Sequence, residues 1–121
     1  MSGASSHRKG VDAEEAAARL SAAEGARILA RRFRTPHGEI DLILEEPGGG
    51  IVFVEVKARG TVEAALEALT PRQARRMEAA ALFWIAAQGF AREPEARFDL
   101  VAFDAQGRPT RLKNIWLASG L

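Results

Sequence analysis

Three charged residues interrupt the most apolar stretches of the sequence. Glu55 and Lys57 fall two positions apart in the run IVFVEVKA (51–58), and Asp41 falls inside the run EIDLILEE (39–46). Because side chains alternate along a strand, Glu55 and Lys57 are expected to point to the same face of it. A carboxylate or an ammonium group in such surroundings is expensive to bury without a partner. The three residues are therefore candidates for a functional site or for an internal ion pair.

The segment between the two runs predicts how they meet. Proline and three glycines occupy positions 47–50, and such a break between two apolar runs favours a hairpin. In that hairpin Asp41 falls near the register of Glu55 or Lys57. Two carboxylates so placed repel each other unless a cation lies between them or one of them is protonated.

The carboxyl groups of Asp41 and Glu55 are oxygen ligands of the kind that suits Mg²⁺ or Mn²⁺, ions that also bind water and phosphate oxygens. A metal held there would lower the pKa of a bound water. Lys57 would orient that water or stabilise charge on a phosphate. The spacing is equally compatible with an ion pair in which Lys57 joins Asp41 or Glu55 and ties the two strands together.

The N-terminal part of the chain predicts a leader, a helix and a strand. Residues 1–10 are polar and small and are expected to be a disordered leader, with residues 11–121 forming one domain. Helix formers fill residues 11–24, with Glu14 and Glu15 in the first turn, where the helix dipole favours acids. Gly25 is a natural stop, and residues 26–33 are expected to be extended.

The remaining elements alternate between helix and strand. After Gly60 we expect a short mobile segment, then a helix over 69–88 with Thr70 as its cap and Pro71 in its first turn. Strands are expected at 97–103 and, at the edge, 111–117. A helix between the strands 51–58 and 97–103 makes a parallel, right-handed crossover the expected connection. The predicted architecture is therefore an α/β sandwich with a mixed sheet.

Composition narrows the class of protein. The 121 residues carry a net charge of +1 and no cysteine, which excludes a disulfide framework or a thiolate metal site. No apolar stretch is long enough to span a bilayer, so we expect a cytoplasmic protein that does not enter the membrane. Four arginines are candidate phosphate contacts, although a solvated helix face explains them equally well: Arg59, Arg72, Arg75 and Arg76. Trp84 and Trp116 are expected to pack against the core and the sheet edge rather than to stack on bases.

Two longer strings make the pattern more specific. GEIDLI (38–43) is followed, after a glycine-bearing loop, by VFVEVKAR (52–59), and RFDLV occurs at 97–101. Together they closely resemble the YraN family of small bacterial proteins over nearly the whole chain beyond residue 10. That family is similar to the PD-(D/E)xK nuclease superfamily, near the archaeal Holliday-junction resolvases. The resemblance implies a restriction-endonuclease-like mixed sheet flanked by helices, with an αβββαβ core.

The resemblance also implies roles for individual residues. Asp41, Glu55 and Lys57 match the strand positions that bind metal and cut phosphodiesters in that superfamily. Glu14 best matches the acid of the first helix, with Glu15 as its competitor, because this chain has Ala13 where the family usually has glycine. Two further residues match helper positions: Glu39, for which a structural role is also compatible, and Gln73 on the following helix.

The expected function is a metal-dependent endonuclease that hydrolyses phosphodiester bonds in DNA, branched or single-stranded, with Mg²⁺ or Mn²⁺. The alternative is a nucleic-acid-binding module that keeps the nuclease fold with little or no activity, because a fold alone does not establish chemistry. A homodimer is a third expectation, with Phe53, Phe83 or Trp84 in its interface.

Overall fold

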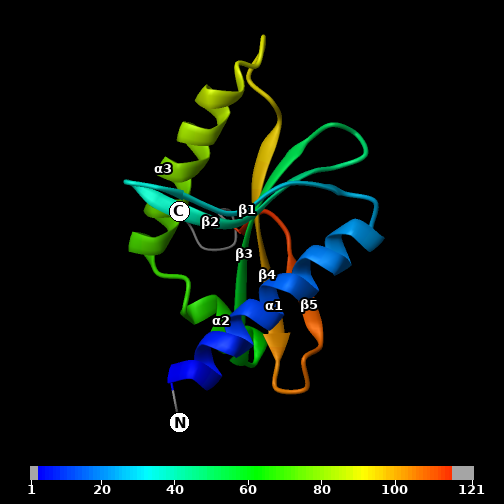
Figure 1. The fold of residues 1–121 in the computed structure, drawn as a ribbon, viewed down its shortest axis with the longest axis vertical. Coiled ribbons are helices and arrows are strands. Elements are labelled where there is room, and N and C mark those ends of the chain that lie inside the picture. Colours follow the sequence, from blue (N-terminus) through cyan, green and yellow to red (C-terminus); the bar gives the residue numbers. More distant parts are fainter. Residues whose placement is uncertain (1–2, 116–121) are drawn as a thin grey trace.

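The computed structural model describes residues 3–115, in which helices flank a mixed five-stranded sheet (Figure 1). The helices are α1 (Gly3–Ala23), α2 (Val62–Glu67) and α3 (Pro71–Gln88). The strands are β1 (Arg27–Thr35), β2 (Gly38–Glu45), β3 (Ile51–Gly60), β4 (Ala96–Asp104) and β5 (Pro109–Leu112). The predicted mixed α/β architecture is confirmed.

The sheet has the order β1-β2-β3-β4-β5. Strands β1, β2 and β3 pair antiparallel, whereas β3 and β4 pair parallel along nearly their whole length. The crossover between β3 and β4 contains α2 and α3, so the predicted parallel connection is confirmed. Strand β5 pairs antiparallel with β4 and closes the far edge.

One face of the sheet is covered by α1 (Figure 1). The buried side chains Ala13, Ala17 and Ala18 pack against Val52 and Val54 of β3 in one core cluster. Alanine adds little bulk, so the helix axis can lie close to the strands. This packing buries apolar side chains of the first half of β3 on this face of the sheet.

The opposite face is covered by α3, which contributes Ala80, Ala81 and Trp84 to a second cluster. The ring of Trp84 meets Phe53 edge to face, with the centroids 5.9 Å apart, and both side chains are buried. The expected packing role of Trp84 is therefore confirmed, while Trp116 lies outside the described residues. Burial removes Phe53 and Trp84 from the expected dimer interface, because neither presents a surface to a second chain.

Three boundaries differ from the predicted ones. Helix α1 begins at Gly3, so it takes in most of the segment predicted as a leader, and adding residues to a formed helix is easier than starting one. The segment after Gly60 is α2 rather than a mobile loop, since Thr61 caps it by accepting from the Ala64 amide at 3.0 Å. Strand β5 ends at Leu112, whereas the predicted edge strand was 111–117.

No helix in residues 3–115 is long and apolar enough to cross a bilayer.

Gly38 brings the β1–β2 hairpin against α3. A Cβ at this position would lie 2.0 Å from the Arg76 carbonyl oxygen. The backbone φ of Gly38 is not positive, so a left-handed conformation does not explain the glycine. The residue is glycine because any side chain would collide with the helix backbone. This contact places the start of β2 beside the N-terminal turns of α3.

Candidate active site

Asp41 and Glu55 meet where β2 and β3 separate. The register of the two strands ends at Leu42 opposite Val54, so Asp41 and Glu55 are the next residue on each strand. The Oδ2 atom of Asp41 accepts a hydrogen bond from the Val56 amide at 2.8 Å, in place of the backbone bond that the diverging strands no longer make. The predicted proximity of Asp41 to Glu55 is therefore found in the structure.

Glu55 is an almost completely buried acid, with 6% of its surface exposed. Its Oε2 atom accepts a hydrogen bond from the side-chain amide of Gln73 on α3. Burial and the adjacent carboxyl of Asp41, which shares a hydrogen bond with it, raise the pKa of Glu55 to about 9, although nearby Lys57 opposes this shift. In the metal-free protein Glu55 is therefore protonated at neutral pH.

Lys57 lies on the same face of β3 as Glu55 and is 9% exposed. Within residues 3–115 its ammonium group makes no ion pair within 4.0 Å and no side-chain hydrogen bond. The ion pair with Asp41 or Glu55 that the sequence left open is thus not formed. The positive charge of Lys57 lowers the pKa of Glu55 by electrostatic attraction to the carboxylate, without a direct contact. No buried side-chain nitrogen or oxygen of the described residues lacks a hydrogen-bond partner, so the Lys57 ammonium group retains access to solvent.

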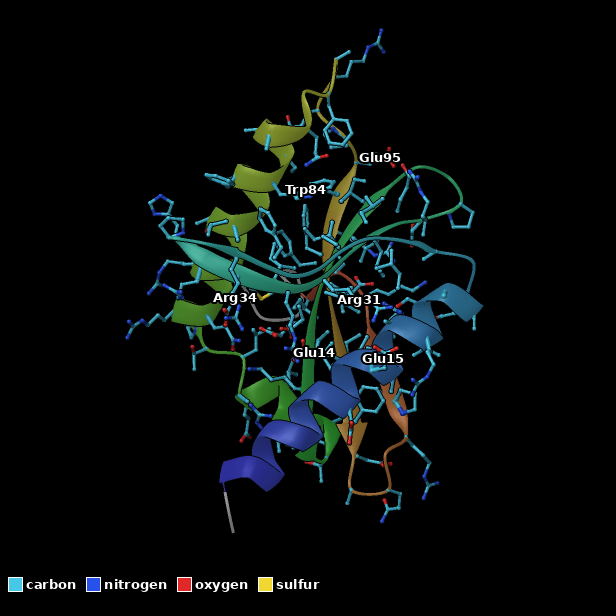
Figure 2. All side chains as sticks on the ribbon, viewed as in Figure 1. Glu14, Glu15, Arg31, Arg34, Trp84 and Glu95 are labelled. Atoms are coloured by element: carbon cyan, nitrogen blue, oxygen red, sulfur yellow. The ribbon has the colours of Figure 1, made fainter. Side chains whose placement is uncertain are left out.

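Glu14 and Glu15 are held by arginines of β1. Glu14 accepts from Arg32 at 3.0 Å, and Glu15 accepts from Arg31 at 2.6 Å. Figure 2 labels Glu14, Glu15 and Arg31. Arg32 adopts a left-handed conformation, with φ of 50°. Helix α1 covers the face of the sheet opposite to α3. Among the described residues no three acidic or imidazole side chains are grouped to hold a metal ion. Of the three predicted metal ligands, the structure therefore brings Asp41 and Glu55 together and leaves Glu14 apart from them.

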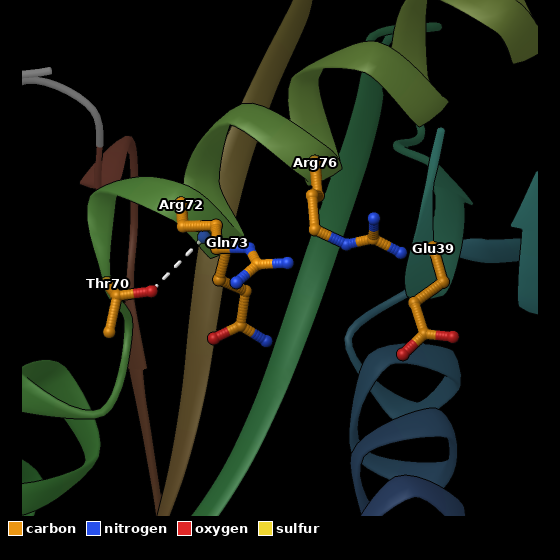
Figure 3. A pocket seen from close by; sticks show the side chains of 5 residues that line it. All are labelled: Glu39, Thr70, Arg72, Gln73 and Arg76. Carbon is orange, nitrogen blue, oxygen red and sulfur yellow. Dashed lines mark hydrogen bonds between the residues drawn. The ribbon is translucent and has the colours of Figure 1, made fainter. Parts of the chain in front are cut away.

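A cavity of about 200 Å³ lies between the start of α3 and β2. Figure 3 shows the side chains that line it. Its lining residues come from the start of α3 and from β2: Glu39, Thr70, Arg72, Gln73 and Arg76. Gln73 connects the cavity to Glu55, because the same side chain lines the cavity and donates to that carboxyl. Glu39 is exposed and pairs with Arg34 at 3.6 Å, so it belongs to the rim rather than to the acid pair.

Arginines without an acid partner gather near this cavity. Eight arginines of the described chain form ion pairs, but Arg72, Arg75 and Arg76 form none within 4.0 Å. Arg59, at the end of β3, donates a hydrogen bond to the Ala58 carbonyl at 3.4 Å. Three of the four predicted phosphate contacts therefore present free cationic groups from one helix end.

A second charged cluster, which the sequence analysis did not identify, surrounds Asp99 on β4. Both oxygens of this fully buried carboxylate accept hydrogen bonds from Arg97, at 2.9 and 3.2 Å. Arg111 adds a contact at 3.4 Å, and the Asn114 amide adds one at 3.1 Å. Arg97 also binds Glu46, whose pKa that hydrogen bond lowers. The two charged residues in RFDLV, Arg97 and Asp99, were the available signal, but their other partners are distant in sequence.

Comparison with known proteins places this fold and site in a family. The profile of the uncharacterised protein family UPF0102 matches residues 13–103, from α1 to β4. The chain belongs to this family. The YraN-type resemblance is thereby confirmed, and the matched span contains Asp41, Glu55, Lys57 and Gln73.

Similar UPF0102 proteins occur in several bacteria. One from Bradyrhizobium is 47% identical over 112 residues, which cover 93% of this chain and 79% of the relative. One from Parvibaculum lavamentivorans is 41% identical over 114 residues, covering 94% and 85%. One from Rhodopseudomonas palustris is 44% identical over 112 residues, covering 93% and 82%. The similarity therefore extends over the whole site rather than over a single motif.

Proposed function

We propose that this UPF0102 protein is a metal-dependent endonuclease that hydrolyses phosphodiester bonds in nucleic acid, with DNA as the expected substrate. The observation that carries the proposal is the Asp41–Glu55 pair, a half-buried and a buried carboxyl group that share a hydrogen bond. Beside them lies Lys57, which has no acid partner in the described chain. A structural ion pair would have matched each acid with a base. Here the acids face each other, which favours a cation as the missing partner.

The acid pair fits Mg²⁺ or Mn²⁺ by the chemistry of its donors. Mg²⁺ is commonly held by one or two carboxylates, with waters and substrate phosphate oxygens completing its shell, so Asp41 and Glu55 suffice as protein ligands. When bound, the ion would polarise the scissile phosphate and lower the pKa of the attacking water. Glu55 must lose its proton to act as a ligand, so binding is coupled to proton release.

The neighbouring side chains have roles that follow from their positions. Lys57 lies on the face of Glu55 and would stabilise the negative charge that grows on the phosphate. Gln73 holds Oε2 of Glu55 and so orients the carboxyl toward Asp41. Arg72 and Arg76 line the adjoining cavity, where they would bind the phosphates flanking the cleaved bond.

The test is cleavage of a labelled panel of duplex, single-stranded, flap and four-way-junction DNA with Mg²⁺ or Mn²⁺. Wild type is expected to cut at least one substrate, and EDTA is expected to abolish cutting. Asp41→Asn and Lys57→Ala should each reduce the rate by at least about 100-fold, because each removes a group acting at the phosphate or at its metal ion. Glu45→Gln, on the same strand as Asp41 but in a surface ion pair, is the matched control that should retain the wild-type rate.

A nucleic-acid-binding module without catalysis is the second candidate function. The free arginines beside the cavity favour it independently of the acid pair. Binding of the panel by wild type and Asp41→Asn, with no cleavage under any metal, would replace the endonuclease proposal with this one. Metal-dependent cleavage that survives Asp41→Asn would also contradict the assigned site.

A further inference from the structure

The outer face of α3 continues from the arginines to exposed apolar side chains. Arg72, Arg76 and Phe83 follow one another at spacings of four and seven residues, which a helix places on one face. Phe83 is 50% exposed although it is aromatic. It follows Arg76 by about two turns, so this row runs from the cavity along the helix.

The ring of Phe83 contacts a second aromatic ring. Phe33 on β1 lies with its ring centroid 6.3 Å from that of Phe83, at an interplanar angle of 44°. This contact positions Phe83 while half of its surface stays open to solvent. An exposed, supported aromatic ring next to unpaired arginines is the combination that binds unpaired nucleotides, with rings stacking on bases and guanidinium groups contacting phosphates.

We propose that the row of Arg72, Arg76 and Phe83 binds a single-stranded segment of the nucleic acid, with Phe83 stacking on an unpaired base. The inference deepens the proposed function, on which it rests for the presence of nucleic acid at the cavity. Arg72 and Arg76 contact the phosphates of this segment at the cavity, and the strand then runs along α3. A continuous duplex offers no free base face to Phe83, because its bases are stacked on one another.

The charges of Arg72 and Arg76 favour single-stranded nucleic acid over a second copy of the chain as the partner of this row. The row has two cationic groups with no acid partner among the described residues, and a polyanion neutralises both of them. A second copy that used the same row would bring no acid to these arginines, because the row itself contains none. The row therefore suits nucleic acid better than a self-interface.

The experiment is fluorescence anisotropy of labelled single-stranded and duplex DNA of equal length, in EDTA so that cleavage cannot contribute. Phe83→Leu, which keeps an apolar side chain against Phe33, is expected to weaken single-strand binding between about 5-fold and 150-fold and to leave duplex binding unchanged. Phe83→Trp should restore it. Phe90→Leu is the matched control, because Phe90 is also exposed but packs on Trp84 beyond the helix end.

The arginines have their own readout. The double variant Arg72→Gln/Arg76→Gln should flatten the plot of log affinity against log salt by about 0.7 for each phosphate that the variant no longer neutralises. Equal affinity of wild type and Phe83→Leu for the single strand would overturn the inference. So would light scattering that shows a wild-type dimer dissociating in Phe83→Leu, since the row would then be an interface between copies. Because the binding measurements involve no metal, their outcome tests the single-strand row independently of the cleavage assay that tests the endonuclease proposal.

Discussion

Two buried acids on neighbouring strands have opposite environments. Asp99 on β4 is on the side of α1, where its partner Arg111 also donates to Ser21 at 2.9 Å and to Glu24 at 3.1 Å. Glu55 on β3 is on the side of α3, where its protein donor is a neutral amide. The same sheet thus buries one acid among guanidinium groups and another beside a second acid.

The difference distinguishes a structural cluster around Asp99 from the proposed metal site at Glu55. Each oxygen of Asp99 accepts two hydrogen bonds, so its charge is compensated within the protein. Glu55 is compensated by a proton instead, as its raised pKa of about 9 indicates. A proton can be replaced by a metal ion, whereas the guanidinium groups around Asp99 leave no such opening.

The largest predicted effect is on the structural cluster. Asp99→Ala removes the buried acid between Arg97 and Arg111 together with the hydrogen bonds that it accepts, so each arginine keeps only a more exposed acid, Glu46 or Glu24. We expect the free energy of unfolding to fall by about 3–5 kcal/mol, measured by urea denaturation. Asp104→Ala, which removes an exposed pair with Arg108, is the control and should change stability by less than about 2 kcal/mol. A decrease of less than about 1 kcal/mol in Asp99→Ala would contradict the structural assignment.

The second effect is the pH dependence of stability caused by Glu55. Its pKa is raised in the folded protein, so the folded state binds a proton that the unfolded state releases above its ordinary pKa. The stabilisation is complete below about pH 4.5 and is lost as pH rises toward about 9. Glu55→Gln cannot titrate, so the stability of wild type relative to this variant should fall by at least about 1.4 kcal/mol between pH 5 and pH 8.

The measurement is urea denaturation of both proteins at each pH in EDTA. Glu45→Gln, whose acid is paired with Arg27 at the surface, should show no comparable trend relative to wild type. A constant difference between wild type and Glu55→Gln would mean that Glu55 is already ionised at pH 5. Glu55 would then not be compensated by a proton, and the proposed difference between Glu55 and Asp99 would be contradicted.

The smallest effect concerns the amide that orients Glu55. Gln73→Ala removes the donor to Oε2 and should lower the free energy of unfolding by about 0.5–1.5 kcal/mol at neutral pH. Gln88→Ala is the matched control, since it makes the same change in helix propensity at the exposed end of α3. Equal stabilities of the two variants would show that Gln73 does not hold the carboxyl.

The local parts of this site could be predicted from the sequence because they depend on neighbouring residues. The alternation of side chains along the strand 51–58 predicted that Glu55 and Lys57 share one face. The proline and glycines at 47–50 predicted the hairpin that brings Asp41 near them. Thr70 and Pro71 marked the start of α3 for equally local reasons.

The contacts across the fold could not be predicted in this way. Glu14 was expected at the metal because the family resemblance matched it to the acid of the first helix, but in the structure it accepts a hydrogen bond from Arg32 of β1. Gly38 has a role that becomes visible only when α3 is in place. Arg97 lies two residues from Asp99, but the other partners come from β5 and from the residues after it, so the local pattern shows only part of the cluster.

The central claim, that Asp41 and Glu55 are a cation site and the Asp99 cluster is not, is tested most directly by calorimetric titration with Mn²⁺ at pH 7.5. We expect one ion per chain, with proton release seen as a dependence of the heat on the ionisation enthalpy of the buffer. Asp41→Asn should abolish this binding, and Glu46→Gln, in the opposite cluster, should leave it unchanged. Equal Mn²⁺ affinity in wild type and Asp41→Asn, or no binding by wild type, would contradict the account.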